Sequence, residues 1–133
     1  MIGEWSGRRV DQADGSRGDM NLEVRSILDG AGLLSEMEIA HDGGVYRGIW
    51  IQVFNPKTET WKGQYANAVR GTWVALEGDG MVFLSHNDDG TVRSKLENRR
   101  LENGQWRRIQ SRTNNGGNTW TVIFIDTLNR VEK

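Results

Sequence analysis

Short segments rich in β-branched and aromatic residues alternate with glycine-containing turn signals along the whole chain. Glycine and asparagine tolerate the positive φ that tight hairpin turns require. The turn signals are Asp14-Gly15, Asp42-Gly43-Gly44, Asn55-Pro56-Lys57-Thr58, Arg70-Gly71, Gly78-Asp79-Gly80, Asp89-Gly90, Asn103-Gly104 and Asn115-Gly116-Gly117. No segment carries a helical apolar stripe longer than two turns. The pattern therefore predicts ten strands, at Ile2–Val10, Asp19–Leu28, Leu33–Ala40, Val45–Phe54, Thr60–Ala68, Thr72–Leu76, Met81–His86, Val92–Leu101, Gln105–Thr113 and Thr119–Asn129.

Ten sequential strands joined by short turns form an antiparallel meander, and closing the meander removes both of its exposed edges. We therefore predict an all-β fold, an antiparallel up-and-down barrel of about ten strands in one domain that spans residues 1–133. The alternative is a two-sheet sandwich. A sandwich more often contains a long crossover connection, and the sequence shows no such segment.

The turns also predict which side chains face the barrel interior, because loop length fixes the register of a hairpin and a one-residue slip exchanges the two faces. If Asn103-Gly104 is a two-residue turn, Arg107 faces the interior, whereas Arg108 and Arg112 face the solvent. Extended to the neighbouring hairpins, this reasoning predicts an interior wall of Trp61, Tyr65, Asn67, Val74, Leu76, Met81, Phe83, Ser85, Val92, Ser94, Leu96, Asn98, Ile109, Ser111, Val122 and Phe124.

The facing of the strand Val45–Phe54 is ambiguous. A four-residue loop around Asn55-Pro56-Lys57-Thr58 turns Trp50, Gln52 and Phe54 inward. A three-residue loop with a bulge instead turns Ile49, Ile51 and Val53 inward. We favour the second arrangement because it avoids exposing three aliphatic positions.

Composition narrows the class of protein. The net charge is −1, so there is no bulk electrostatic attraction for nucleic acid or for an anionic membrane. Cysteine is absent, which excludes a disulfide scaffold and thiolate chemistry. No apolar run approaches a membrane span of roughly 20 residues, and the first residues contain no signal-peptide core. We expect a soluble, cytoplasmic protein.

Several short motifs resemble a known group of barrels. Gly3-Glu4-Trp5 is similar to the opening motif of the lipocalin and calycin barrels. The stretches "VFNPKTETWKGQYAN" and "NNGGNTWTVIFIDTLNR" resemble a bacterial family of unknown function with a lipocalin-like barrel. The resemblance implies that Trp5 closes the barrel floor, that Arg130 packs across its ring, and that the interior can hold a ligand. The family has no catalytic motif to transfer.

The predicted interior mixes aromatic residues with hydroxyls and amides. Each buried polar group without a partner costs about 1–3 kcal/mol, so a dry core would rarely contain so many of them. A cavity that holds water or a polar ligand would satisfy these groups, whereas the alternative is that several of them lie at the wet rims of the barrel. The residues from which we expect ligand contacts are Trp61, Tyr65, Asn67, Phe83, Asn98, Arg100, Arg107 and Asp126.

Arg100 and Arg107 face each other in the predicted register, with Asp126 one diagonal step away at the barrel mouth. Two facing arginines repel each other unless an anion lies between them. Asp126 can supply that anion in a structural cluster, and a ligand carboxylate or phosphate is the other candidate. Ion-pair clusters are common at barrel rims, which favours the structural interpretation.

Metal, haem and catalytic chemistry find little support. His41 and His86 fall at loop edges rather than in an apolar pocket, so haem ligation is disfavoured. No spacing matches a zinc or calcium site. The carboxylates fall mostly on outer or turn positions, and no nucleophile lies beside a base. Trp73 is predicted to face outward, within an apolar patch that suits a homodimer interface or a helical lid from the Asp11–Gly32 region.

The favoured function is non-enzymatic binding of a small, partly hydrophobic and anionic ligand inside the barrel, without a cofactor, a metal, nucleic acid or a membrane. The alternative is a structural or protein-interaction module, homodimeric in one form, whose barrel is filled by its own side chains. An enzymatic activity has no residue constellation behind it.

Overall fold

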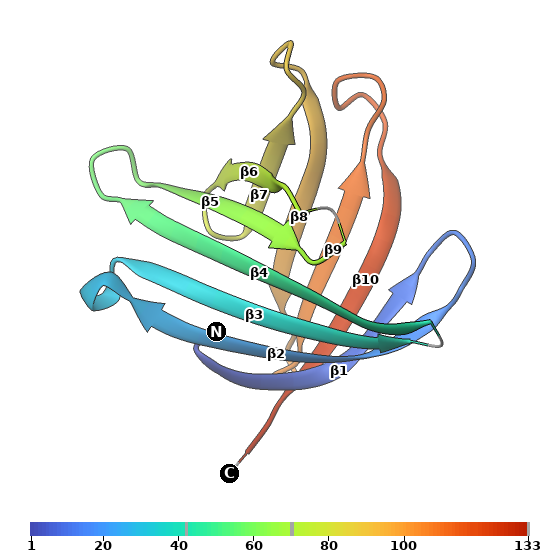
Figure 1. The fold of residues 1–133 in the computed structure, drawn as a ribbon. Helices are drawn as coiled ribbons and strands as arrows, with labels where there is room; N and C mark the ends of the chain where they lie inside the picture. Colours follow the sequence, from blue (N-terminus) through green and yellow to red (C-terminus); the bar gives the residue numbers. More distant parts are fainter. Residues whose placement is uncertain (42, 70, 133) are drawn as a thin grey trace.

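The structure, a computed structural model, describes residues 1–41, 43–69 and 71–132. Its chain folds into ten antiparallel strands and one short 3-10 turn, η1 (Leu28–Gly30), as Figure 1 shows. The predicted all-β fold of ten strands is confirmed. The strands are β1 (Gly3–Asp11), β2 (Arg17–Ile27), β3 (Gly32–His41), β4 (Gly44–Asn55), β5 (Thr60–Asn67), β6 (Trp73–Gly78), β7 (Val82–His86), β8 (Val92–Arg100), β9 (Trp106–Arg112) and β10 (Thr121–Arg130).

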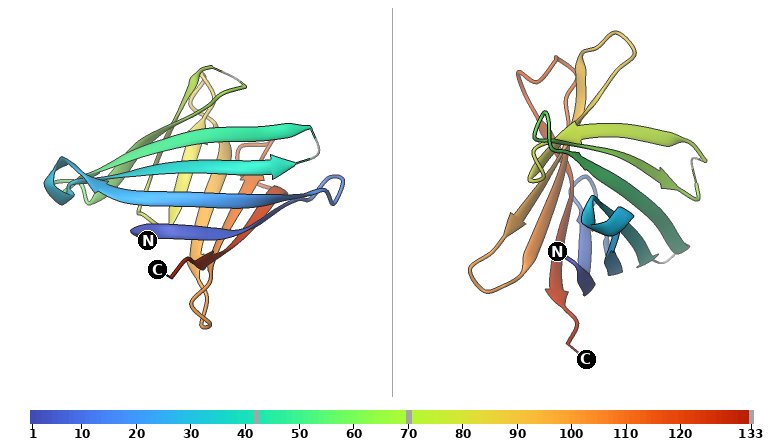
Figure 2. Two further views of the ribbon diagram at one scale, coloured as in Figure 1. Left: turned by 60° about the horizontal axis from the view of Figure 1, so that its bottom comes forward. Right: turned by 90° about the vertical axis from the view of Figure 1, so that its left-hand side faces the viewer.

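The strands form a closed barrel rather than a sandwich. Each strand pairs with its neighbours in sequence, and β1 pairs with β10 from Trp5 opposite Arg130 to Asp11 opposite Phe124. Strands β2 to β4 cross β8 to β10 at a steep angle, and the two ends of the chain lie on the same side of the molecule (Figure 2). Among the described residues, no helix is long and apolar enough to cross a membrane.

Close backbone approach at the closing seam requires a glycine. Gly7 of β1 lies opposite Leu128 of β10. A Cβ atom at Gly7 would stand 1.9 Å from the carbonyl oxygen of Thr127, far inside van der Waals contact. The seam between the first and last strands therefore depends on the missing side chain at this position.

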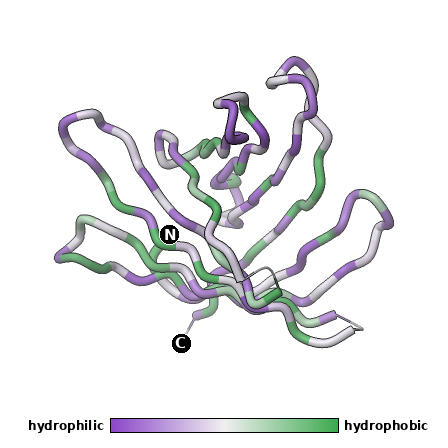
Figure 3. The backbone as a smooth tube through the Cα atoms, turned by 45° about the horizontal axis from the view of Figure 1, so that its top comes forward, coloured by the Kyte–Doolittle hydropathy of each residue, from purple (hydrophilic) through white to green (hydrophobic). Residues whose placement is uncertain are grey.

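The apolar core closes one end of the barrel. Its members alternate with polar residues along the strands, which Figure 3 shows as interchanging hydrophobic and hydrophilic segments. Trp5 packs edge-on against Trp106, with ring centroids 5.4 Å apart. The guanidinium groups of Arg100 and Arg130 each lie 5.6 Å from the Trp5 ring, so the contact expected between Arg130 and Trp5 is present. The core residues are Trp5, Met20, Leu22, Val24, Met37, Ile39, Trp106 and Leu128.

The turn between β8 and β9 differs from the prediction by one residue. Leu101 N donates to Gln105 O at 2.8 Å, and Gly104 N donates to Leu101 O at 2.9 Å. The loop therefore has three residues, with Gly104 in the left-handed region at φ 86°.

This slip reverses the predicted faces of β9. Arg108 pairs with the inward residue Asn98, and Arg112 pairs with Ser94. Arg108 and Arg112 thus face the interior, and the prediction that they face solvent is wrong. Arg107, Ile109 and Ser111 lie on the opposite face, and the prediction that they line the interior is wrong as well.

Strand β4 takes the arrangement that the sequence did not favour. Asn55 pairs with Thr60, which leaves a four-residue loop from Pro56 to Glu59 and turns Trp50 and Gln52 inward. Trp50 packs edge-on against Phe83, with ring centroids 5.1 Å apart. Burial of this large aromatic outweighs the cost of leaving aliphatic Val53 exposed, because apolar stabilisation scales with buried area.

The structure confirms some of the other predicted side-chain orientations and contradicts others. Phe83 opposite Leu96 and Ser85 opposite Ser94 are confirmed. Trp73 points outward and is 54% exposed, as predicted. Met81 and Val122, predicted to be interior, are exposed, because Met81 precedes β7 and Val122 lies beside the bulge of β10. Asp42 and Arg70, which belong to two of the predicted turns, lie outside the described residues.

Candidate functional site

A cavity of about 710 Å³ occupies the barrel between the apolar core and the opposite end. Residues from the strand ends and hairpins at that end line it, among them Asp11, Gly43, Val69 and Arg112. The Trp5–Trp106 core closes the other end. A volume of this size is typical of a site for a small organic molecule.

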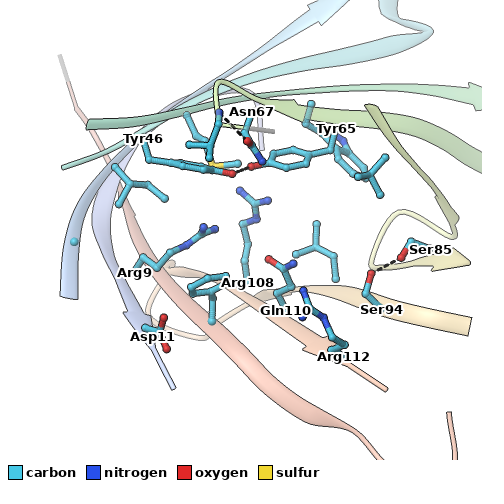
Figure 4. A pocket seen from close by; sticks show the side chains of 18 of the residues that line it. Arg9, Asp11, Tyr46, Tyr65, Asn67, Ser85, Ser94, Arg108, Gln110 and Arg112 are labelled. Carbon is cyan, nitrogen blue, oxygen red and sulfur yellow. Dashed lines mark hydrogen bonds between the residues drawn. The ribbon is translucent and has the colours of Figure 1, made fainter. Parts of the chain in front are cut away.

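The cavity has two chemically different walls (Figure 4). Strands β3 to β6 contribute a largely apolar and aromatic wall, made of Met37, Ile39, Tyr46, Trp50, Tyr65, Val74 and Leu76. Strands β8 to β10 and β1 contribute a polar and cationic wall, made of Arg9, Ser94, Leu96, Arg108, Gln110, Arg112 and Phe124.

Strand pairing brings three charged residues together at the cationic wall. Asp126 of β10 pairs with Arg9 of β1 on one side and with Arg108 of β9 on the other. Arg9 donates from Nε and from one terminal nitrogen to the two carboxylate oxygens of Asp126, at 2.7 and 2.9 Å. Asp126 is 2% exposed, so this ion pair is largely shielded from water.

Arg108 is left without such a partner. It is 8% exposed, forms no salt bridge with a carboxylate of the described residues, and its buried Nε has no hydrogen-bond partner. Figure 4 shows its guanidinium pointing across the cavity toward the hydroxyls of Tyr46 and Tyr65. A buried cation in this state is costly unless an anion reaches it.

The electrostatic surroundings of Arg108 agree with this geometry. Burial lowers the pKa of the Arg108 guanidinium, Asp126 opposes that shift, and the neighbouring Arg9 adds to it. An arginine remains a cation at neutral pH despite such a shift. The cluster of Arg9, Asp126 and Arg108 thus carries one positive charge that no described residue neutralises in a salt bridge.

Hydroxyl and amide pairs order the remaining polar groups. Tyr46 and Tyr65 share a short hydrogen bond between their hydroxyls, and Ser85 and Ser94 share another. Below the cavity, Trp106 donates from its indole nitrogen to Asn98 Oδ1 at 3.2 Å. These contacts give hydrogen-bond partners, without a ligand, to four side chains that were predicted to line the interior: Tyr65, Ser85, Ser94 and Asn98.

The sequence-predicted site residues are only partly brought together. Tyr65 and Asn67 line the cavity. Asp126 lies beneath the cationic wall of the cavity. Asn98 lies below the cavity, in contact with Trp106. Phe83 is fully buried and packs against the cavity residue Trp50.

Three of the predicted site residues lie elsewhere. Arg107 is on the outer face, and Arg100 lies at the closed end over Trp5, so the predicted facing pair at the mouth is wrong. Trp61 lies near the β4–β5 loop, where its ring centroid is 5.2 Å from that of Phe54. The arginine–aspartate–arginine arrangement exists, but with Arg9 and Arg108 in the two cationic positions.

Sequence reasoning missed Arg9, Arg108 and Tyr46. The signal for Arg9 was present, because Trp5, Gly7, Arg9 and Asp11 share one face of β1 by simple alternation from a buried tryptophan. In the same way, buried Trp106 indicates that Arg108, two residues later on the same strand, also faces the interior. His41 lines the rim and accepts a hydrogen bond from Gly43 N, and no metal-binding cluster is present among the described residues.

Comparison of the chain with protein-family models and with curated proteins found no match.

Proposed function

We propose that this protein binds a small, partly hydrophobic organic anion inside its barrel and does not transform it. The observation that carries the proposal is Arg108, a buried guanidinium that faces a cavity of about 710 Å³ and forms no salt bridge with a described carboxylate. An anionic group beside Arg108 would neutralise the charge, and the apolar wall opposite would take the body of the ligand.

The cavity favours this function over a module whose barrel is filled by its own side chains. Close packing would leave few voids larger than a water molecule, whereas this interior has room for an organic molecule. The apolar wall and the cationic wall also face each other across the space, which suits an amphiphilic ligand.

We also propose that the chain is a bacterial lipocalin-like, or calycin, protein. Support comes from the closed ten-strand barrel and from Gly3-Glu4-Trp5, whose tryptophan closes one end of the barrel with Arg130 across its ring. A ligand in the interior is consistent with that placement.

Thermal unfolding with a panel of small molecules tests the binding proposal. Phenylbutyrate and decanoate should raise the melting temperature, whereas phenylbutyramide, with the same body and no charge, should raise it much less. A ligand at 100 times its dissociation constant stabilises the folded state by about 2.7 kcal/mol. No stabilisation by any anion, or equal stabilisation by the amide, would contradict the proposal.

Tryptophan fluorescence locates the binding. Trp50 lines the cavity, whereas Trp73 points outward. A ligand-dependent change in emission should therefore be clearly smaller in Trp50→Phe and kept in full in the matched variant Trp73→Phe, while both variants keep the thermal stabilisation. Loss of the change in Trp73→Phe alone would place the ligand on the outer surface.

A further inference from the structure

Cationic groups occupy two depths of the same wall. Arg108 and Arg112 share the inner face of β9, with Gln110 between them. Four residues of a strand span roughly 13 Å, so the two guanidinium groups serve different levels of the cavity. Arg108 lies next to the apolar core, whereas Arg112 lies at the open end.

The two levels differ in how strongly they attract an anion. Arg112 is exposed, and ion pairs at exposed positions contribute little because water screens them. Arg108 is 8% exposed, and charges interact more strongly where water is excluded. The acidic group of a ligand is therefore held most strongly at Arg108, with the body of the ligand extending toward the mouth.

The charge at the deep level is limited by Asp126. Arg9 and Arg108 supply two positive charges and Asp126 supplies one negative charge, which leaves a single positive charge. A singly charged acid group balances the cluster. A doubly charged group would bring a second negative charge to this buried level, where the cluster of Arg9, Asp126 and Arg108 has no further cation to pair with it, and an unpaired buried charge is strongly unfavourable.

We propose that Asp126 sets the charge of the ligand's deep group at one, so that the cavity selects monoanionic acids such as carboxylates over dianionic ones such as phosphonates. The inference rests on the proposed function. Asp126 acts as a specificity-determining residue through Arg9 and Arg108 and does not line the cavity itself.

Calorimetric titration of the wild-type protein at pH 9 provides the first test, because the compared ligands share one body. Phenylpropylphosphonate is a dianion at that pH, its monomethyl ester is a monoanion, and phenylbutyrate is the matching carboxylate. We expect the ester and the carboxylate to bind roughly tenfold or more tightly than the dianion. Equal or tighter binding of the dianion overturns the inference. This comparison uses no variant and does not depend on how a substitution folds.

Substitutions then identify the residues responsible. Asp126→Asn adds one positive charge to the cluster, so the order should reverse and the dianion should bind more tightly than its ester. Arg108→Met should bind phenylbutyrate and phenylbutyramide within about threefold of each other, whereas the matched variant Arg112→Met should keep most of the preference for the carboxylate. A carboxylate preference that is lost in Arg112→Met and kept in Arg108→Met overturns the inference but leaves the proposed function standing. If no anion binds the wild-type protein, the proposed function fails as well.

Discussion

Asp126 binds Arg9 with both of its carboxylate oxygens, at 2.7 and 2.9 Å, although its cross-strand neighbour Arg108 faces the same interior. One carboxylate thus neutralises one guanidinium group, that of half-buried Arg9, and leaves the buried guanidinium group of Arg108 without a salt bridge to a described residue. A ligand-free barrel in this state holds an electrostatic cost at the position where an anion would be most stabilising. Four measurable consequences follow from the cluster, the closing seam and a turn.

Replacement of Arg108 should stabilise the ligand-free protein. In Arg108→Met, an apolar side chain takes the place of a buried cation without a salt bridge, and we expect the free energy of unfolding to rise by about 1–3 kcal/mol. Urea denaturation measures it. Arg112→Met, on the same face but exposed, should stay within about 0.5 kcal/mol of the wild-type value. A clear loss of stability in Arg108→Met would mean that the guanidinium is well satisfied without a ligand.

Removal of the Asp126 charge should have the opposite effect. Asp126→Asn leaves Arg9 and Arg108 close together and without a carboxylate, so we expect a loss of about 3–5 kcal/mol in the free energy of unfolding. Asp88→Asn, at an exposed turn position, provides the control. If Asp126→Asn and Asp88→Asn have the same urea midpoint, Asp126 does not have the central role in the cluster that we give it.

The close approach of β1 and β10 at Gly7 predicts that a single added methyl group there lowers the free energy of unfolding strongly. Gly7→Ala places a Cβ atom 1.9 Å from Thr127 O, so either β1 or β10 must move, at a cost of about 3 kcal/mol or more. Gly104→Ala has open space around the new atom and meets only the strain of φ 86°, about 1–2 kcal/mol. Chemical denaturation of the two variants should therefore rank Gly7→Ala as the less stable. The reverse order would show that the seam tolerates a wider spacing.

Asp79 should make the stability of the turn between β6 and β7 depend on pH in the acid range. Its carboxylate accepts hydrogen bonds from Val82 N at 2.8 Å and Met81 N at 2.9 Å, which lower its pKa. Since the folded-state pKa is the lower one, the carboxylate stabilises the fold above its unfolded pKa of about 3.9 and loses that contribution as the pH falls further. Wild type should exceed Asp79→Asn in urea midpoint at pH 7, and the difference should shrink by pH 3. A difference that grows on acidification would contradict this assignment.

The strands were predictable because their ends carry a local signal. Gly15, Gly90 and Gly104 all take positive φ, as expected of glycines in tight turns. Local turn chemistry and alternation were therefore enough to place ten strands and to indicate closure.

The faces of β9 were not predictable in the same way. A two-residue turn and a three-residue turn can each place Gly104 at positive φ, yet they differ by one residue in register. Hydrophobicity could not decide between them, because both faces of this strand carry arginine and both carry an apolar residue: Arg107 with Ile109 on one, Trp106 with Arg108 on the other. An interior strand face that carries charged residues lacks the apolar stripe by which sequence patterns identify an interior.

The seam between β1 and β10 has a consequence for the order in which the protein acquires its structure. Every other neighbouring pair of strands is joined by a short connection, whereas this one joins residues more than a hundred positions apart, and such contacts form slowly. Arg9 and Asp126 lie on the two sides of the seam. A folding intermediate with nine hairpin-joined pairs in place would therefore have its aromatic wall and Arg108 but not yet the Arg9–Asp126 ion pair, and the net charge of the cluster would be established only in the step that closes the barrel.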